Sequence, residues 1–263
     1  MTLVVISREY HAGKRLLPQP SYEHARSVPL VPLCGAELSL AAQEFPICFA
    51  SDGAGITPAA LLYPEPGGNA FVGADGSWLA SYIPAAFRAY PFALARKEGT
   101  DEMVLCLHEA AALSDTDGEP LFTESGEPGA VVLKARDFFI EIERNRAATA
   151  VACAALAKRN LLVPWPLQID KGDGNTVSSP LSLLKLDEAA FNALDEPGVA
   201  ELWQAGAFPV AYAHMLSLGR MAHLGRMIAA QRPQQAQPQA KPPVDLDRVF
   251  GITTNEAELH FNF

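Results

Sequence analysis

The sequence predicts an α+β fold: an antiparallel, β-rich N-terminal half packed with two long helices and a C-terminal hairpin, followed by a flexible linker and a short C-terminal tail. Three observations lead to this prediction. Short apolar runs separated by proline and glycine fill residues 28–110, a pattern typical of strands joined by turns. Helical periodicity marks residues 131–160 and 209–230. Proline and glutamine dominate residues 231–243, and this composition cannot bury much surface.

The β-rich half contains two expected hairpins. Asp75-Gly76 separates residues 69–73 from residues 77–80, and glycine supplies the positive φ that a tight turn needs. Residues 92–97 and 103–108 form the second hairpin. Further strands are expected over residues 28–33, 45–50 and 56–63. A helix is expected over residues 35–44, a helical turn over residues 84–90, and a polar loop over residues 111–130.

The helix over residues 131–160 has the clearest amphipathic pattern in the chain. Its inward face is predicted from apolar and small residues that recur every three or four positions. These residues are Phe138, Ile142, Asn145, Thr149, Ala152 and Leu156. The helix over residues 209–230 carries a short repeat, Leu-Gly-Arg-Met, which is either a coincidence or a place where glycines let another helix approach closely.

The C-terminal hairpin is expected from residues 163–170 and 176–186. Its first strand contains Pro164 and Pro166, which cannot donate backbone hydrogen bonds, so this strand is predicted at a sheet edge. Asp187 is expected to cap a short helix over residues 189–194.

The domain organisation follows from these elements. We expect residues 1–230 to form one compact domain, with its β-rich part at 28–110 and its helix and hairpin part at 131–230. Residues 231–243 are the linker, and residues 244–263, which regain apolar content, are a docking segment.

Composition and charge narrow the function class. The chain has 263 residues, 49% of them hydrophobic and 19% charged, which is ordinary for a globular protein. Residues 27–133 hold fourteen acids but only three bases, so most of the net charge of −10 lies there. Such a region repels phosphate backbones and argues against nucleic-acid binding. It is either a docking surface for a basic partner or a solvated acidic face.

The cysteines and the absence of a long apolar run suggest the compartment. Cys34, Cys48, Cys106 and Cys153 lie in apolar surroundings and form no Cys-x-x-Cys pair, which favours buried free thiols in a reducing environment. No stretch reaches the ~20 apolar residues that a membrane-spanning helix needs. We therefore expect a cytoplasmic protein that does not insert into membranes.

The chain contains none of the common local motifs for catalysis or phosphate binding. There is no phosphate-binding glycine loop, no Gly-x-Ser-x-Gly and no His-Glu-x-x-His. His214 and His223 are nine residues apart, which on one helix would place them on opposite sides, so they do not face one metal ion. We expect no metal and no cofactor, and we identify no catalytic residue.

One aromatic stretch is the first candidate for binding. Trp78, Tyr82 and Tyr90, together with Phe87 and Phe92, could line a peptide groove in which Arg88 grips a carboxylate. Arg88 is the only base between residues 27 and 95. The alternative is the edge of a core, where aromatic residues are also common.

The tail is the second candidate. Val249, Phe250, Phe261 and Phe263 are its anchor candidates, and the linker would raise the tail's effective concentration at a nearby groove. The tail docks on its own domain, on a sister subunit or on another protein, or stays disordered. A homo-oligomer that swaps its tails is left open.

Several segments together resemble the SapC-like family, which is named for a component of bacterial surface-layer export. The similar segments are residues 31–34, 44–49, 82–92, 117–122, 126–128, 138–146 and 212–218, and the similarity extends from about residue 28 to about residue 227. The resemblance implies a bacterial protein linked to surface-layer assembly or transport. It implies no catalytic residue set.

Two function hypotheses follow. The first is a non-enzymatic accessory protein that binds a polypeptide client or a partner enzyme through the aromatic stretch, the acidic region or the tail. The alternative is an enzyme that modifies peptides or cell-surface precursors, with a site gathered from the distant residues Arg88, His108, Glu109 and His214.

Overall fold

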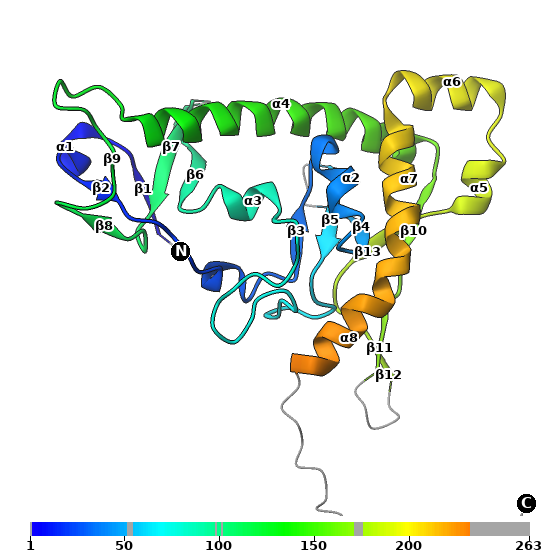
Figure 1. The fold of residues 1–263 in the computed structure, drawn as a ribbon. Coiled ribbons are helices and arrows are strands. Elements are labelled where there is room, and N and C mark those ends of the chain that lie inside the picture. Colours follow the sequence, from blue (N-terminus) through cyan, green and yellow to red (C-terminus); the bar gives the residue numbers. More distant parts are fainter. Residues whose placement is uncertain (1, 52–54, 98, 101, 171–175, 232–263) are drawn as a thin grey trace, which may run out of the picture.

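The computed structural model describes residues 2–51, 55–97, 99–100, 102–170 and 176–231. The architecture is α+β, as predicted, with antiparallel sheets throughout. Helix α4 (Ala130–Lys158) runs along the molecule and joins two groups of strands (Figure 1). Its first turns lie over the smaller group and its last turns over the larger one.

The larger group is a five-stranded sheet in the order β10-β13-β4-β5-β3. β10 is an edge strand, as its prolines predicted. Pro164 has no backbone N–H to donate, and on the open side of an edge strand no hydrogen-bond donor is needed. The strands are β3 (Leu30–Pro32), β4 (Ile47–Ser51), β5 (Ile56–Leu61), β10 (Leu162–Pro164) and β13 (Leu183–Leu186).

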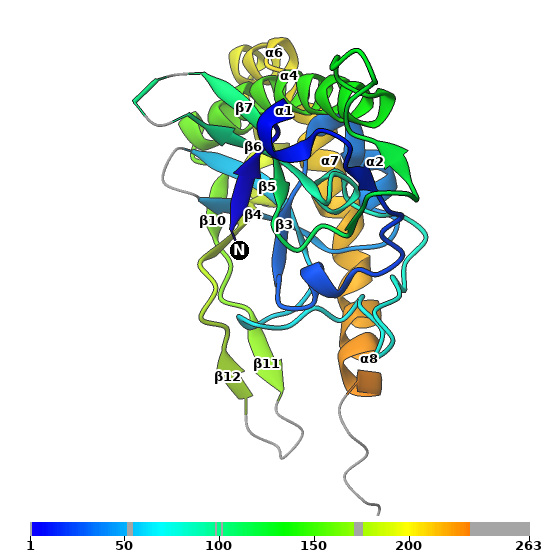
Figure 2. The same cartoon turned by 90° about the vertical axis from the view of Figure 1, so that its left-hand side faces the viewer.

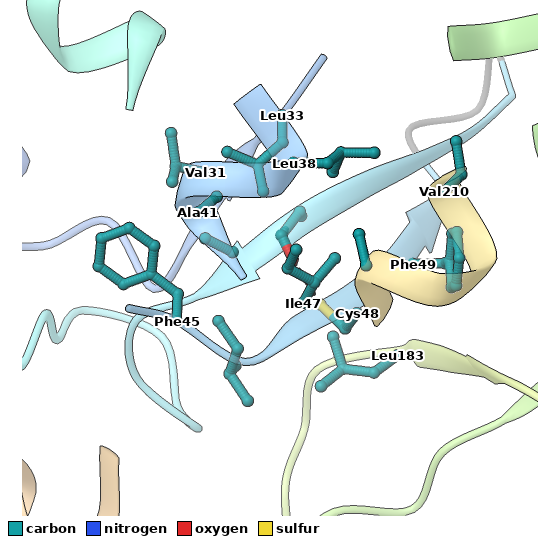
Figure 3. Close-up of a cluster of buried hydrophobic side chains, with 14 of the residues drawn as sticks. Val31, Leu33, Leu38, Ala41, Phe45, Ile47, Cys48, Phe49, Leu183 and Val210 are labelled. Carbon is teal, nitrogen blue, oxygen red and sulfur yellow. Dashed lines mark hydrogen bonds between the residues drawn. The ribbon is translucent and has the colours of Figure 1, made fainter. Parts of the chain in front are cut away.

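The main hydrophobic cluster lies against this sheet. Phe45, Ile47 and Phe49 are fully buried in it, and Figure 3 shows them between the strands and the neighbouring helices. α4 contacts β5, while α7 contacts β4 and β13. Burying each large apolar side chain contributes about 1.5–3 kcal/mol, so this cluster is the main source of stability.

The smaller group consists of two three-stranded sheets, in the orders β1-β7-β6 and β8-β2-β9. The expected hairpin of residues 92–97 and 103–108 is present as β6 and β7. A second hydrophobic cluster, which includes Phe92, Leu107 and Leu121, packs these sheets against the start of α4. The strands are β1 (Leu3–Val5), β2 (Arg15–Leu16), β6 (Phe92–Arg96), β7 (Met103–His108), β8 (Leu113–Ser114) and β9 (Glu119–Pro120).

The predicted inward face of α4 is confirmed. Thr149, Ala152 and Leu156 are buried, and Phe138, Ile142 and Asn145 are partly buried. The Thr149 hydroxyl accepts a hydrogen bond from the Gly35 amide at 2.7 Å. This bond ties α4 to the turn that precedes α2.

The remaining helices are short, and most lie around the larger sheet. α3 lies between the two groups of strands, beneath α4 (Figure 1). The helices are α1 (Arg8–His11), η1 (Glu23–Ala25), η2 (Gly35–Glu37), α2 (Leu38–Ala41), α3 (Ala85–Arg88), α5 (Glu188–Asn192), α6 (Glu196–Gln204), α7 (Ala207–Ser217), η3 (Leu218–Arg220) and α8 (Met221–Gln231).

The single helix expected over residues 209–230 is divided into α7, η3 and α8. Ser217 ends α7 because its hydroxyl donates to the His214 carbonyl at 2.6 Å and accepts from the Ile47 amide at 2.8 Å. Such back-bonding bends helices. Within the described residues, nothing lies within 4 Å of where a Cβ on Gly219 or Gly225 would stand, so these glycines do not mediate a close helix approach.

The C-terminal hairpin is present in two sections. β10 pairs with β13, and β11 (Gln168–Asp170) pairs with β12 (Thr176–Ser178). Asp187 caps α5 as predicted, since its carboxylate accepts from the Ala190 amide at 3.0 Å. Figure 2 shows that the β11–β12 ribbon and α8 extend from the end of the molecule opposite α4.

Two expectations need correction. The hairpin of residues 69–73 and 77–80 is shorter than expected: it consists of one bridge between Val72 and Trp78, closed by hydrogen bonds from the Gly73 amide to the Ser77 carbonyl at 2.8 Å and from the Leu79 amide to the Phe71 carbonyl at 2.9 Å. The predicted loop of residues 111–130 contains β8 and β9, which pair with β2.

The limits of the linker also differ from the prediction. Gln231 is the last residue of α8, and not the first of the linker. Residues 232–263, which include the rest of the linker and the whole docking segment, lie outside the described residues. The single domain over residues 1–230 stays a prediction.

Candidate functional site

A cleft of about 790 Å³ lies where the two hydrophobic clusters meet. Four segments line it: residues 16–24 from the end of β2 onward, residues 83–92 around α3, residues 118–119 at the start of β9, and residues 131–139 in the first turns of α4. These segments are far apart in the sequence, so only the fold brings them together. Ligand sites commonly have about 300–1,000 Å³, and this cleft is within that range.

The walls of the cleft are mainly apolar and aromatic. Phe87 and Phe92 are almost fully buried, and Phe138 and Phe139 on α4 face them across the cleft. Phe87 belongs to the larger cluster, whereas Phe92 and Phe139 belong to the smaller one. An apolar segment can therefore be bound between two preformed surfaces.

Two cationic side chains also line the cleft. The Arg88 guanidinium lies over the Phe138 ring, 5.3 Å from its centroid, and over the Tyr82 ring at 5.7 Å. Lys134 is exposed on α4. Within the described residues, neither side chain forms an ion pair. Glu119 is the one acid among the described lining residues, so the cleft is a locally basic place in an acidic region.

Hydrogen bonds with neighbouring residues hold the Arg88 side chain in place. Its Nε donates to the Ile83 carbonyl at 3.0 Å, and its Nη2 lies 3.4 Å from the Tyr82 hydroxyl. Tyr82 in turn donates to Glu37 at 2.9 Å. Burial, together with the nearby Glu37 charge, raises the pKa of Tyr82 to about 12, which keeps its donated proton in place.

Glu37 is a buried residue whose hydrogen bonds hold Tyr82 and the start of α3 in position. It accepts hydrogen bonds from the Tyr82 hydroxyl, from the Ala85 amide at 2.6 Å and from the Cys34 amide at 3.0 Å. The Ala85 bond satisfies a free amide at the start of α3. Glu37 thus fixes the helix that carries Arg88.

His24 and Tyr90 form one side of the cleft, and His108 packs against Tyr90 from outside the lining. The His24 and Tyr90 rings are parallel, with centroids 3.8 Å apart, and the His108 ring lies 5.2 Å beyond Tyr90. Among the residues that the structure describes, neither ring nitrogen of His24 has a hydrogen-bond partner, and neither does Nδ1 of His108. Tyr90 borders both this cleft and a smaller one of about 260 Å³ beside His108.

The environment of the stack favours neutral histidines. Burial lowers the pKa of His24, and repulsion from His108 lowers it further. A backbone group of Ser21 has a smaller, opposite effect on this pKa, although it is not placed to form a hydrogen bond with the ring. Burial also lowers the pKa of His108. A neutral imidazole with free nitrogens can accept a hydrogen bond from a ligand or donate one to it.

The structure separates the binding residues that the aromatic stretch suggested. Arg88 and Tyr90 line the cleft, with Phe87 and Phe92. Trp78 lies behind it, packed on Tyr22, Phe45, Phe71 and Phe87, and its indole nitrogen donates to the Tyr82 carbonyl at 2.8 Å. Tyr82 supports Arg88 from outside the lining. Val249, Phe250, Phe261 and Phe263 lie outside the described residues.

The residues of the enzyme hypothesis do not converge. His214 is buried in the larger cluster, where its Nε2 accepts from the Leu186 amide and its Nδ1 donates to the Ile47 carbonyl. His108 and Glu109 lie at the end of β7 in the smaller group. Across the described ranges, no group of three or more His, Cys, Asp or Glu side chains is placed to hold a metal ion.

The cysteines are buried and free, as predicted. Burial raises the pKa of the Cys34 thiol to about 11 and that of the Cys48 and Cys153 thiols to about 12. Burial also raises the pKa of Cys106. All four are therefore protonated and poor nucleophiles near neutral pH.

His24, Lys134 and the Phe138–Phe139 pair were missed as site residues. Phe138 was recognised only as part of the inward face of α4. No local pattern marks His24 or Lys134, because the fold alone brings them to the same cleft as Arg88: His24 lies 64 positions before Arg88 in the sequence, and Lys134 lies 46 positions after it.

Comparison with known proteins identifies the family. The SapC family model matches residues 6–224, which is most of the chain and begins earlier than the resemblance seen in the sequence. No curated protein and no solved structure gives a match. In the described part of the chain, none of the helices combines the length and apolarity needed to cross a bilayer. On the extent of the family match, this chain belongs to the SapC family.

Proposed function

We propose that this protein is a non-enzymatic accessory protein that binds a polypeptide in the cleft between its two hydrophobic clusters. The client is an external polypeptide or a partner enzyme. The proposal includes a cytoplasmic location and, through the family name, a link to surface-layer transport. Its main support is one observation: Arg88 and Lys134 lie beside an apolar, aromatic wall and form no ion pair with any described residue.

The arrangement fits a peptide that presents aromatic or aliphatic side chains next to a carboxylate. The phenylalanines of the cleft would bury the apolar side chains of the peptide. Arg88 can form a bidentate pair of hydrogen bonds with a carboxylate. Arg88 lies over an aromatic ring and is already oriented by Tyr82 and Ile83. Little side-chain entropy is then lost on binding.

A direct test uses two short fluorescein-labelled peptides. One alternates glutamate with phenylalanine or leucine, and the other has lysine in place of glutamate. Fluorescence anisotropy is expected to show tighter binding of the acidic peptide, with an affinity that falls as salt is added because the charge pairs are screened. Equal affinity for both peptides, or no binding of either, would contradict the proposal.

A second candidate function is supported by the His24–Tyr90–His108 stack. Neutral histidines with unpartnered nitrogens beside a cleft are suitable for general acid–base work. This candidate corresponds to the enzyme that modifies peptides or cell-surface precursors. It predicts that a peptide incubated with the protein changes in mass, and that His24→Phe abolishes the change. An unchanged peptide mass would remove this candidate.

A further inference from the structure

The described chain ends at Gln231, which is linked to the wall of the cleft through a series of contacts. The side chain of Gln231, the last residue of α8, donates to the Ala70 carbonyl at 2.8 Å and to the Val72 carbonyl at 3.2 Å. Val72 is bridged to Trp78, and the Trp78 ring lies 5.4 Å from Phe87, which lines the cleft. Three successive contacts between neighbours therefore lead from the end of α8 to the cleft wall.

The linker is long enough to span this distance. Packed layers lie about 10 Å apart, so three contacts span roughly 30 Å at most. Residues 232–243 can extend to about 40 Å, and a proline-rich linker tends to be extended. Because Val72 and Phe87 are buried, the linker has to run over the surface and cannot follow these contacts. Phe250 is 19 residues beyond Gln231 and can lie up to about 60 Å from it, which leaves length for the longer surface path.

The segment beyond the linker matches the chemistry of the cleft. Residues 244–263 carry four acids (Asp245, Asp247, Glu256 and Glu258) and one base (Arg248), and they include Phe250, Phe261 and Phe263. The cleft offers an aromatic wall and two unpaired cations, Arg88 and Lys134. Complementary charge and apolar content thus occur within one chain.

A second apolar surface of the molecule is less suitable. The surface formed by α6 and α7 exposes Trp203 and Tyr212, with the partly buried Phe208 between them, around a hollow of about 600 Å³. Its described lining contains the acid Glu196 and no base. This surface would repel an acidic segment.

We propose that residues 244–263 occupy the cleft of the same chain and compete there with an external polypeptide. This inference rests on the proposed function, because it assigns a competitor to the same site. A client would then need to displace the tail, so the effective affinity for clients would depend on the tail as well as on the cleft.

The test compares full-length variants, so that the linker is kept. One variant replaces the apolar anchors (Phe250→Ser, Phe261→Ser and Phe263→Ser). The matched control replaces polar residues of the same segment (Thr253→Ser, Thr254→Ser and Asn262→Ser). Hydrogen–deuterium exchange of residues 83–92 and 131–139 is measured at several protein concentrations, together with the affinity for the acidic probe peptide.

If the tail occupies the cleft, the anchor variant exchanges at least several-fold faster in these two segments, and it binds the probe about tenfold more tightly. The control behaves like the wild type. Protection that disappears on dilution would overturn the inference, because it would come from the tail of a second copy. Faster exchange only in α6 and α7 would also overturn it.

The two proposals can fail separately. If the variants exchange alike and bind the probe equally well, the tail does not occupy the cleft, and the binding function stands. If the anchor variant loses cleft protection but never binds the probe, the tail occupies the cleft, and the proposed binding of an external polypeptide fails.

Discussion

The His24 ring lies flat against the Tyr90 ring, with centroids 3.8 Å apart and an angle of 7° between the planes. This contact joins the segment after β2 to the segment after α3, and it forms one side of the cleft. The histidine contributes as a neutral ring, since burial lowers its pKa. The stability of this side of the cleft should therefore depend on pH.

The first prediction concerns that dependence. The pKa values of His24 and His108 are lowered from the ordinary value of 6.5. As the pH falls through 6.5, the unfolded chain takes up protons that the folded stack does not, so the free energy of unfolding decreases until the lowered folded values are reached. Urea unfolding should show this loss, and His24→Phe should make the dependence shallower. His223→Phe, which leaves the stack intact, is the control. An unchanged slope in His24→Phe would argue against the assigned cause.

A second prediction concerns Glu37. Glu37→Ala leaves the Cys34 amide, the Ala85 amide and the Tyr82 hydroxyl without their acceptor. Buried groups without partners are costly, so we expect a loss of about 3 kcal/mol in the free energy of unfolding, measured by urea denaturation. Glu124→Ala removes an exposed acid and should change stability by less than about 0.5 kcal/mol. Similar values for both variants would show that Glu37 does not organise α3.

A third prediction contrasts two glycines. A Cβ on Gly129, at the start of α4, would collide with the Pro120 carbonyl, whereas a Cβ on Gly225 in α8 would meet nothing within 4 Å. Gly129→Ala should destabilise the protein by roughly 2 kcal/mol or more, because backbone must move. Gly225→Ala should stabilise it by about 0.5–1 kcal/mol through helix propensity. Thermal unfolding would contradict this account if both substitutions shifted the midpoint in the same direction.

A fourth prediction concerns the thiols. Cys34, Cys48, Cys106 and Cys153 are buried, with raised pKa values. A colorimetric disulfide reagent should react slowly with the native protein at neutral pH and rapidly with four thiols after denaturation. Fast reaction of any native thiol would show that its surroundings open readily.

The sequence predicted the elements whose signals are local. The β6–β7 hairpin, the inward face of α4, the edge position of β10 and the Asp187 cap all follow from patterns within a few residues. Such patterns report local geometry directly.

Elements that depend on distant partners were missed or shortened. β1 and β2 have three and two residues and pair with strands about 100 positions away. α6 was missed because Glu196-Pro-Gly resembles a turn, although Asp195 accepts from the Gly198 amide and the proline occupies the first turn, where it favours a helix start.

The candidate site could be predicted only in part for the same reason. Arg88 and Tyr90 lie in one conspicuous stretch and were found. His24 and Lys134 join them only after the two clusters pack on α4, and no spacing in the sequence encodes that packing. Trp78 looked equally suitable for binding, but it packs among core rings instead.

The central claim is that the unpaired cations of the cleft hold an acidic polypeptide. The most direct measurement is the dissociation constant of the acidic probe peptide for Arg88→Gln and Lys134→Gln, with Arg136→Gln as the control. Arg136 lies two residues from Lys134 but is paired with Asp137 and does not line the cleft. We expect each cleft variant to bind the peptide with a roughly tenfold weaker affinity, because each loses one charged hydrogen bond. We expect no change in affinity for the control. Equal affinities for all three variants and the wild type would contradict the account.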